Sequence, residues 1–396
     1  MLAKSKVCKL LIIGDMYSQY IENFSLTLNN YDDSLEIDIV NPISIKEIQY
    51  EKREPYNKVF SYRPLNPIIA KIPKLRGILT KRKLNKTIDN VNKNIAQYDV
   101  ILIQGFWLPN CYVFSKLNKQ NIFSVGAIWG SDFYKRQENE YKIFSTIDHC
   151  DLLVISTQEM VRDVLKVKQV DQSKIRNCFF GLAPLLPLFQ LQNITGKESK
   201  KILGFNEDDF IIICGYNGSP NLQHHKIISM LSQIGSKLPA KTKVILPITY
   251  GGSNEYKMEI KKELKASGLE HVIYENFLSD EKIAHLRKAT DLMIQIPITD
   301  AFSGSLQEHL FAQNIVIAGN WLPYHSLKDK GIYYETIDSV TELKEKLLFV
   351  FENLTDIKNK VIQSNTAEKF KSSLWSECIK DWHSVIMEYK SNANEP

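Results

Sequence analysis

The chain from Leu292 to Gly319 contains the residues best suited to chemistry. Two apolar runs flank a loop and a helix, and Ser303, Gly304 and Ser305 lie where that helix should begin. At the carboxyl edge of a parallel sheet, a helix N-terminus offers free N–H groups and the positive end of its dipole to a phosphate. Glu308 follows one turn later and could accept hydrogen bonds from both hydroxyls of a ribose. The segment therefore predicts a cradle for a diphosphate.

The start of this helix also has a purely structural interpretation. Ser305 and Glu308 match the S-x-x-E capping box, in which the glutamate only satisfies a backbone N–H group. The two interpretations differ for Glu308→Ala. A binding role predicts a strong loss of nucleotide affinity with an intact fold, because a lost cap costs only ~1 kcal/mol. A capping role predicts unchanged nucleotide affinity.

Two further turns in the same half contain glycine directly after an apolar run. GYNGSPN includes Gly215, Asn217 and Gly218, and PITYGGS includes Tyr250 and Gly251. Turns of this composition occur as plain strand-to-helix connections. They also let backbone N–H groups approach a diphosphate or an acceptor closely. The sequence supports either role.

Short β-branched runs alternate with longer amphipathic stretches, which is typical of strands and helices around parallel sheets. The runs expected to form strands are Val7–Ile13, Leu35–Val40, Val100–Gln104, Asn121–Ala127, Leu152–Ile155, Phe210–Cys214, Lys243–Pro247, His271–Tyr274, Leu292–Ile296 and Ile315–Ala318. Phe180–Lys200 breaks the pattern with prolines and glycines. We therefore predict an α/β chain with two Rossmann-like domains at 1–185 and 200–365. Asn41–Leu84 is expected to be a long surface insertion.

The end of the chain carries an apolar stripe spaced by three or four residues, which predicts a helix over 370–392. Its members are Phe370, Leu374, Trp375, Ile379, Trp382, Ile386 and Tyr389. We expect this helix to pack back on the N-terminal domain. Burial on its own domain would give the same pattern.

The composition excludes several classes of protein. A net charge of +5 over 396 residues is too small for a nucleic-acid-binding surface. The six cysteines are scattered without metal-ligand spacing, so we expect no metal site and reduced thiols in a cytoplasmic protein. No run approaches the ~18 apolar residues of a membrane-spanning helix. Basic residues do gather at 71–86, either as a solvated face or as a contact with an anionic membrane.

Asp300 and Glu308 enclose seven residues and resemble the E-x7-E motif of the large retaining glycosyltransferase family with the GT-B fold. The resemblance implies two Rossmann-like domains with parallel sheets facing a cleft, and a C-terminal helix that crosses back. It also implies that Asp300, a departure from the family's glutamate, is catalytic and lies near the donor sugar. Glu308 would then hold the ribose.

The same resemblance suggests how the rest of the donor site is built. The family places Arg and Lys near the leaving diphosphate, and Arg287 and Lys226 are the substitutes available here, with His224 and His225 as further donors. PITYGGS is similar to the YGG-type loop of bacterial transferases that assemble surface polysaccharides, including the lipid-linked fucosamine transferase group. Those relatives invert the anomeric centre, so retention and inversion both stay open. The stretch 277–291 looks like the family's base-proximal region, or simply a capped helix.

On the acceptor side, IWGSDFY resembles the W-G-S-D turn of many bacterial relatives. This implies that Trp129 and Gly130 line the acceptor site and that Asp132 orients an acceptor hydroxyl or acts as the base. Alternatively, Ser131 or Asp132 caps the helix that follows. Gly14, after the first apolar run, is expected at the same edge of its sheet.

The resemblance implies a metal-independent, hexosyltransferase-type glycosyltransferase that uses a nucleotide sugar as co-substrate, with no separate cofactor. Its acceptor would be a glycan or a lipid-linked acceptor of bacterial surface polysaccharide synthesis, at the inner face of the plasma membrane. Two alternatives share the expected fold. One is a sugar-nucleotide epimerase, which needs no acceptor, and the other is a catalytically silent scaffold that binds sugar nucleotides.

Overall fold

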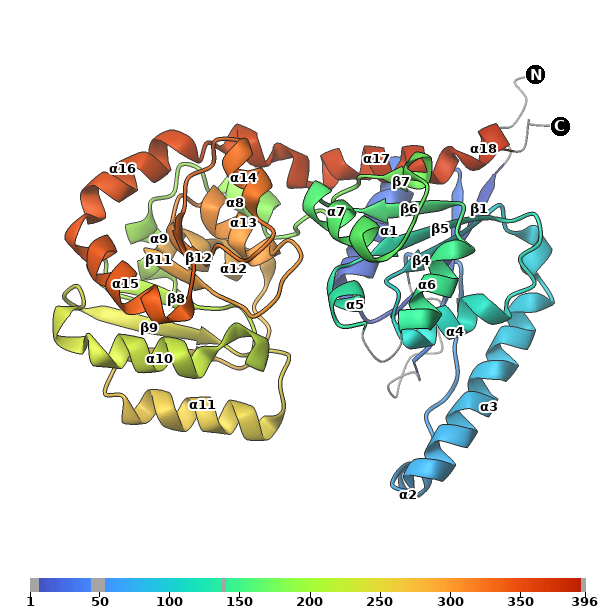
Figure 1. Ribbon diagram of the computed structural model, residues 1–396, viewed down its shortest axis with the longest axis horizontal. Coiled ribbons are helices and arrows are strands. Elements are labelled where there is room, and N and C mark those ends of the chain that lie inside the picture. Colours follow the sequence, from blue (N-terminus) through green and yellow to red (C-terminus); the bar gives the residue numbers. More distant parts are fainter. Residues whose placement is uncertain (1–6, 44–53, 137–139, 393–396) are drawn as a thin grey trace. The chain divides into compact units, whose positions relative to one another are not determined.

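A computed structural model describes residues 7–43, 54–136 and 140–392 (Figure 1). The chain forms two compact units, each with its own parallel sheet. The first comprises the chain up to Gly181 and the segment from Trp375 onward, and the second is Leu182–Leu374. The predicted α/β fold with two parallel sheets is confirmed.

The first unit has a seven-stranded sheet in the order β3-β2-β1-β4-β5-β6-β7. The strands are β1 (Cys8–Ile13), β2 (Leu35–Val40), β3 (Lys58–Phe60), β4 (Val100–Gln104), β5 (Phe123–Ile128), β6 (Leu152–Ile155) and β7 (Ile175–Arg176). The helices are α1 (Gln19–Tyr31), α2 (Pro67–Ala70), α3 (Pro73–Asn92), α4 (Leu108–Lys116), α5 (Ser131–Tyr134), α6 (Glu140–Asp148), α7 (Gln158–Val167), α17 (Trp375–Met387) and α18 (Tyr389–Asn392). β2 and β3 lie on one side of β1, and the strands from β4 onward lie on its other side. The position between β1 and β4 is therefore a topological switch point.

Two predictions for the first unit need correction. The region 41–84, expected to be a surface insertion, contributes the edge strand β3 to the sheet and also contains the short helix α2 and the first half of α3. Residues 44–53 of that region lie outside the described residues. The strand expected from Asn121 begins only at Phe123, since Asn121 adopts a left-handed backbone conformation with φ of 64°.

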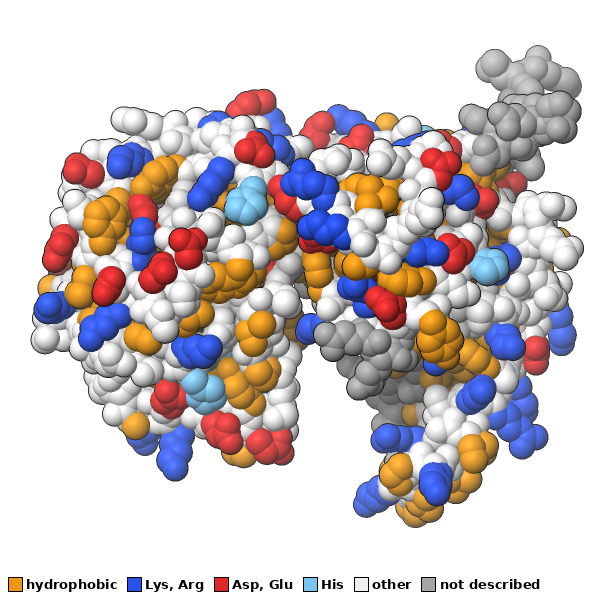
Figure 2. Space-filling view, viewed as in Figure 1, with side chains coloured by type: hydrophobic (Ala, Val, Ile, Leu, Met, Phe, Trp, Pro, Cys, Tyr) orange, Lys and Arg blue, Asp and Glu red, His pale blue; other side chains and the backbone are white. Residues whose placement is uncertain are grey.

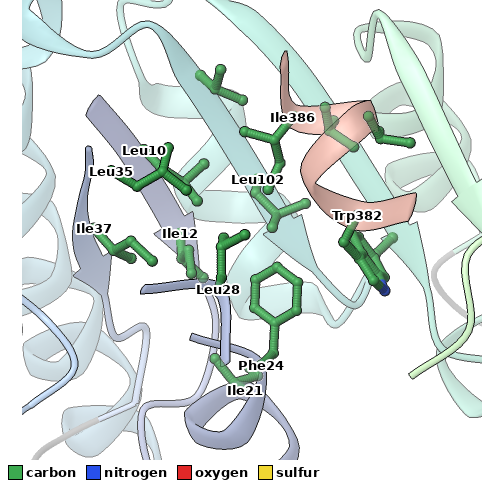
Figure 3. Packing of buried hydrophobic residues seen from close by; sticks show 14 of the residues in the cluster. Leu10, Ile12, Ile21, Phe24, Leu28, Leu35, Ile37, Leu102, Trp382 and Ile386 are labelled. Atoms are coloured by element: carbon green, nitrogen blue, oxygen red, sulfur yellow. The ribbon is translucent and has the colours of Figure 1, made fainter. Parts of the chain in front are cut away.

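The C-terminal helix α17 supplies part of the core of the first unit (Figure 3). Trp382 is fully buried, and its ring lies 5.1 Å from that of Phe24 in α1. The indole N–H donates to the carbonyl of Phe179 at 2.9 Å. Ile386 packs in the same cluster with Leu102 of β4. The two distant ends of this unit's sequence therefore share one core.

The predicted helix over 370–392 is wrong in its first part. A 3₁₀ helix, Ala367–Ser373, ends before α17 starts at Trp375, and Phe370 packs in the core of the second unit. Ser373 explains the break, because its carbonyl accepts from the Leu182 N–H and its hydroxyl donates to Gln307. These contacts with distant residues outweigh the local helical pattern.

The second unit has a six-stranded parallel sheet in the order β10-β9-β8-β11-β12-β13. The strands are β8 (Phe210–Cys214), β9 (Thr242–Pro247), β10 (His271–Tyr274), β11 (Leu292–Gln295), β12 (Ile315–Gly319) and β13 (Glu335–Ile337). The helices are α8 (Leu185–Gln190), α9 (Gly196–Ile202), α10 (His224–Gln233), α11 (Asn254–Ala266), α12 (Asp280–Ala289), α13 (Gly304–Phe311), α14 (His325–Asp329), α15 (Leu343–Glu352) and α16 (Leu354–Ser364). Helices cover both faces of the sheet, which explains the continuous apolar runs of its strands (Figure 1).

All six cysteines are buried and none forms a disulfide, as predicted. Burial raises the pKa of the thiols, for example that of Cys214 to about 12. They therefore act as protonated core side chains. None of the helices in the described ranges combines the length and the apolar character needed to cross a bilayer.

Candidate functional site

The loops that carry most of the predicted site residues meet at one edge of the second unit's sheet. β8 and β11 are neighbouring central strands. In the strand order, the chain continues from β8 to β9 in one direction and from β11 to β12 in the other. The loop after β8 contains Gly215, Asn217 and Gly218, and the loop after β11 leads to α13. This carboxyl edge at a switch point is where open α/β sheets bind ligands.

Hydrogen bonds between the loops hold this edge together. The Asn221 side chain accepts from the Thr299 N–H and donates to the Thr299 carbonyl, and the Gln223 amide donates to the Ile296 carbonyl at 2.6 Å. The indole N–H of Trp321, after β12, donates to Pro297 at 2.9 Å. The loops after three strands are therefore tied into a single rigid edge.

Glycines allow the loop after β9 to pack directly on the loop after β8. The Gly218 N–H donates to the Tyr250 carbonyl at 2.7 Å. A Cβ atom on Gly252 would lie 2.0 Å from the Gly218 carbonyl oxygen, and both Gly251 and Gly252 have positive φ. No other residue type fits this contact. The turns GYNGSPN and PITYGGS thus form one backbone surface, not two separate connections.

Helix α13 begins at this edge, and its cap differs from the capping-box interpretation. Ser303 is the N-cap residue, and its hydroxyl accepts from the Leu306 N–H at 3.2 Å. Ser305 lies inside the helix, and its buried hydroxyl has no hydrogen-bond partner among the described residues. The amides of Gly304 and Ser305, in the first turn, precede the first hydrogen bond of the helix. Glu308 is therefore not the glutamate of a capping box.

Glu308 instead forms a buried ion pair with Arg287. The Arg287 Nε donates to a Glu308 carboxylate oxygen at 2.9 Å, and both side chains are only 8% exposed. Arg287 lies in the last turn of α12, and neither of its other two guanidinium nitrogens has a hydrogen-bond partner among the described residues. Two N–H-bearing groups thus stay available to an anion beside the start of α13.

Asp300, the first acid of the predicted motif, is held by two side chains. Its carboxylate accepts from the Tyr324 hydroxyl at 2.6 Å and from the Gln295 amide at 3.2 Å. Burial raises the pKa of Asp300, and the hydrogen bonds from Tyr324, the Ala301 N–H and Gln295 oppose this rise. Gln295 keeps a buried carbonyl oxygen without a partner among the described residues. Both carboxylate oxygens are therefore held in place, one by Tyr324 and Gln295 and the other by the Ala301 N–H.

Tyr250, in the loop after β9, lies within electrostatic range of both acids and of Arg287. Burial raises the pKa of Tyr250, the Asn217 side chain lowers it, and the charges of Glu308 and Asp300 raise it further. The ring of Tyr250 is stacked on that of Phe277, with centroids 5.7 Å apart and an angle of 4°. The edge thus also offers a flat aromatic surface.

The remaining predicted donors of this unit have other partners. Lys226 donates to the Gln223 side chain at 2.8 Å, and His225 pairs with Glu263. His224 is fully buried beside Tyr256, and burial lowers its pKa to about 4. Each of these three side chains already has a protein partner. We therefore do not assign them to an anion.

In the first unit, Asp132 organises the loops at the corresponding edge. Its carboxylate is only 3% exposed and accepts from the N–H groups of Phe106, Trp129 and Phe133 at 2.6 to 3.0 Å. Burial raises its pKa while these backbone donors lower it. Asp132 does not cap α5, whose N-cap is Gly130, so the capping interpretation is wrong. Its role as the base or in orienting an acceptor hydroxyl stays a prediction.

The other predicted residues of the first unit lie around the switch point between β1 and β4. The Trp129 indole N–H donates to the Gln104 side chain at 3.1 Å, and the Gln104 amide nitrogen is buried without a partner among the described residues. A Cβ atom on Gly14 would lie 3.2 Å from that of Gln104. Gly130 has φ of 104°, which turns the chain after β5. The structure therefore groups Gly14 and Trp129 around Gln104, and Gly130 follows Trp129 in the chain.

Three further side chains lie at these edges and were not predicted, namely Gln104, Gln295 and Tyr324. The two glutamines could have been predicted from the sequence, because each ends an otherwise apolar strand, VILIQ or LMIQ. A buried polar residue at the carboxyl end of a central strand faces the ligand edge. Tyr324 could not have been predicted, since only the fold brings it to Asp300. Among the described residues, no cluster of His, Cys, Asp and Glu side chains is suited to hold a metal ion.

Comparison with solved structures shows where this fold occurs. The chain is similar to sucrose-phosphate synthase from Thermosynechococcus elongatus, with a TM-score of 0.73, 11% identity, and coverage of 97% of this chain and 100% of that one. It is similar to HepE of Anabaena in complex with UDP-glucose, with a TM-score of 0.67, 13% identity, and coverage of 97% and 99%. It is also similar to WaaG, a glycosyltransferase involved in lipopolysaccharide biosynthesis, with a TM-score of 0.67, 11% identity, and coverage of 96% and 99%.

The same fold occurs in a Listeria monocytogenes protein assigned as a UDP-N-acetylglucosamine 2-epimerase. The TM-score is 0.62 at 14% identity, covering 99% of this chain and 98% of that one. No protein-family profile and no curated protein sequence matches the chain. At these identities the comparisons establish the fold, the GT-B architecture, over nearly the whole chain.

Proposed function

We propose that the protein is a glycosyltransferase that moves a sugar from a nucleotide-sugar donor, with the donor bound by the second unit. The observation that carries the proposal is the buried Arg287–Glu308 pair beside the free first turn of α13. A carboxylate, a guanidinium and helix-start amides within one loop cluster suit a ribose and a diphosphate. The similar HepE structure was solved with UDP-glucose, which supports this class of ligand.

In the proposed reaction, the bond between the anomeric carbon and the diphosphate oxygen breaks, and a bond between that carbon and an acceptor hydroxyl oxygen forms. The hydroxyl proton passes to the departing diphosphate or to water. The first-turn amides of α13, its dipole and the free nitrogens of Arg287 stabilise the negative charge that develops on the departing diphosphate. Glu308 accepts hydrogen bonds from the ribose hydroxyls. Asp300, oriented by Tyr324, lies toward the donor sugar. This proposal needs no metal ion, because protein donors supply the charge stabilisation.

The finer assignments are also proposals. The first unit would present the acceptor, using the loops that hold Gly14, Trp129 and Gly130. A glycan or lipid-linked acceptor of bacterial surface polysaccharide synthesis fits the resemblance of PITYGGS to the loop of such transferases. Similarity to WaaG, a glycosyltransferase of lipopolysaccharide biosynthesis, supports the same class of acceptor. A hexose donor and a cytoplasmic location at the inner face of the plasma membrane complete the proposal.

A sugar-nucleotide epimerase is the second candidate, supported by the similar structure from Listeria monocytogenes. Its nucleotide site would involve the same cluster, so binding alone does not separate the two. The difference lies in the acceptor. An epimerase converts the sugar nucleotide without one, whereas a transferase releases nucleotide in proportion to glycosylated acceptor.

Two measurements test the proposal in sequence. Thermal stabilisation of the purified chain by a panel of nucleotides and sugar nucleotides identifies the ligand, because binding to the folded state raises the unfolding midpoint. Turnover of the best sugar nucleotide is then followed with and without glycolipid acceptors. Acceptor-dependent release of nucleotide supports the transferase. Acceptor-independent conversion supports the epimerase, binding without turnover supports a scaffold, and no stabilisation by any nucleotide refutes all three.

A further inference from the structure

The most basic segment of the chain forms a helical projection from the first unit. Between Glu54 and Asp89 there are nine Lys and Arg residues and no acidic residue. The rest of the chain has 41 Lys and Arg against 45 Asp and Glu, so the positive excess of the protein lies entirely here. Figure 1 shows α2 and the first half of α3 extending away from the sheet of the first unit.

The first half of α3 makes no buried contact. Its buried residues are Leu84, Thr87, Ile88 and Val91, all in the second half. At ~1.5 Å per residue, the eleven residues from Pro73 to Lys83 extend about 16 Å beyond this anchored part. Lys83 braces the base of the projection, because its Nζ donates to the carbonyls of Arg63 and Pro64 at 2.9 and 3.0 Å.

Apolar side chains at the tip of the projection point away from the protein. Ile68, Ile72 and Ile78 are 75%, 51% and 66% exposed. By helical spacing, Leu75 and Ile78 lie on the side of α3 opposite to its buried residues, so they do not continue the stripe that packs on the sheet. Figure 2 shows hydrophobic and basic side chains together at this tip. The exposed apolar face is thus a separate feature that needs its own partner.

The charges at the tip have no partner within the described residues. Lys74, Arg76 and Arg82 form no ion pair there, and Lys71 through Ile78 are all exposed. A partner must therefore supply dense negative charge and also an apolar phase for the isoleucines. A bilayer with anionic headgroups offers both. Nucleic acid offers only the charge and would leave the apolar face in water.

We propose that the α2–α3 tip docks the protein peripherally on an anionic membrane surface. The isoleucines enter the headgroup region, and the flanking Lys and Arg side chains contact lipid phosphates. The docking needs no nucleotide and no turnover. The outcome of its test is therefore independent of the transferase proposal.

The test is co-flotation of the full chain with vesicles of phosphatidylcholine, with and without phosphatidylglycerol. Each basic side chain near an anionic surface contributes about fivefold to the partition coefficient, so Lys74→Gln/Arg76→Gln/Arg82→Gln should lower binding to anionic vesicles about 100-fold. The matched control, Lys237→Gln/Lys262→Gln/Lys265→Gln, removes three exposed lysines of the second unit and should leave binding within about twofold.

A second pair of variants tests insertion of the apolar tip. Ile72→Ser/Ile78→Ser should lower binding at least about tenfold, whereas Met258→Ser/Ile362→Ser, at exposed positions of the second unit, should not. Unchanged circular dichroism in all variants verifies the fold. Equal binding of the wild type and the Lys/Arg variant refutes the proposal. So does equal binding of the wild type and the isoleucine variant, or retention by an RNA oligonucleotide without retention by vesicles.

Discussion

Replacing Glu308 separates its contribution to nucleotide binding from its contribution to the fold. Glu308→Ala leaves the Arg287 guanidinium without its carboxylate in a site where both side chains are 8% exposed. Breaking such a pair from one side costs about 3–5 kcal/mol, because a buried charge stays uncompensated. The structure therefore revises the expectation of an intact fold at the ~1 kcal/mol of a lost cap.

The cost should be visible in thermal unfolding. For a unit of this size, each kcal/mol lowers the midpoint by about 2–4 °C, so Glu308→Ala should lower it by about 6–20 °C. Arg287→Met/Glu308→Leu removes both charges and should be close to the wild type in stability, since apolar replacement of a whole buried pair is often neutral. A small loss in the single variant would contradict the buried pair.

Nucleotide affinity is then measured by calorimetry with the best nucleotide of the panel, well below every unfolding midpoint. Hydrogen bonds to a charged group contribute about 1.5–3 kcal/mol each. The stable double variant loses the two bonds proposed between Glu308 and the ribose and also the proposed Arg287 contacts with the diphosphate, so binding should weaken at least about 100-fold. Wild-type affinity in that variant would leave both Glu308 and Arg287 with purely structural roles.

Lys200→Met provides the matched control for this experiment. Lys200, whose side chain is 9% exposed, forms an ion pair with Asp291, which is 32% exposed and precedes β11 at the opposite edge of the same sheet. The variant should lower the unfolding midpoint without changing nucleotide affinity. A loss of affinity there would show that destabilisation alone impairs binding, and the result for Glu308 would lose its meaning.

Four further predictions follow from single contacts. Gly252→Ala should abolish nucleotide binding and destabilise the fold by more than the ~1–2 kcal/mol that positive φ alone costs, whereas Gly268→Ala, at positive φ in open space, should cost only that amount in urea unfolding. Tyr324→Phe removes the hydroxyl that donates to the Asp300 carboxylate, so it should lower kcat more than it raises KM for the sugar nucleotide. Trp382→Ala should cost about 3–5 kcal/mol, measured as a lower urea midpoint of the first unit's transition. Because the folded pKa of His224 is lowered to about 4 from 6.5, the wild type should lose roughly 3 kcal/mol as pH falls through this range. His224→Gln lacks this contribution, so its stability should decline less with acid, and identical pH profiles would contradict the burial argument.

Local patterns were enough to predict the parallel sheets. Strands such as β8 and β11 lie between two layers of helices and therefore read as continuous β-branched runs in the sequence. Glycine turns after them marked the edge that carries the candidate site, because the carboxyl ends of parallel strands share one side of a sheet. Ser303, Gly304 and Glu308 were found for the same reason. Each of these features depends on residues close together in the chain.

Short or edge elements carried too little pattern to be predicted. β3, β7 and β13 have three, two and three residues, which is below the length at which alternation becomes visible. They form because an existing sheet offers free N–H and C=O groups at its edges. What determines these strands is therefore the neighbouring strand and not the pattern of their own residues.

The sequence by itself determined the fold class, the burial of the cysteines and the edge at which the candidate site lies. Only the tertiary structure decided that Glu308 pairs with Arg287, that Asp132 serves the N–H group of Phe106, and that the last helix starts after Ser373. The physical reason is the same in each case. These polar groups choose among partners far along the chain, and burial makes an unmet hydrogen bond costly enough to override the local preference.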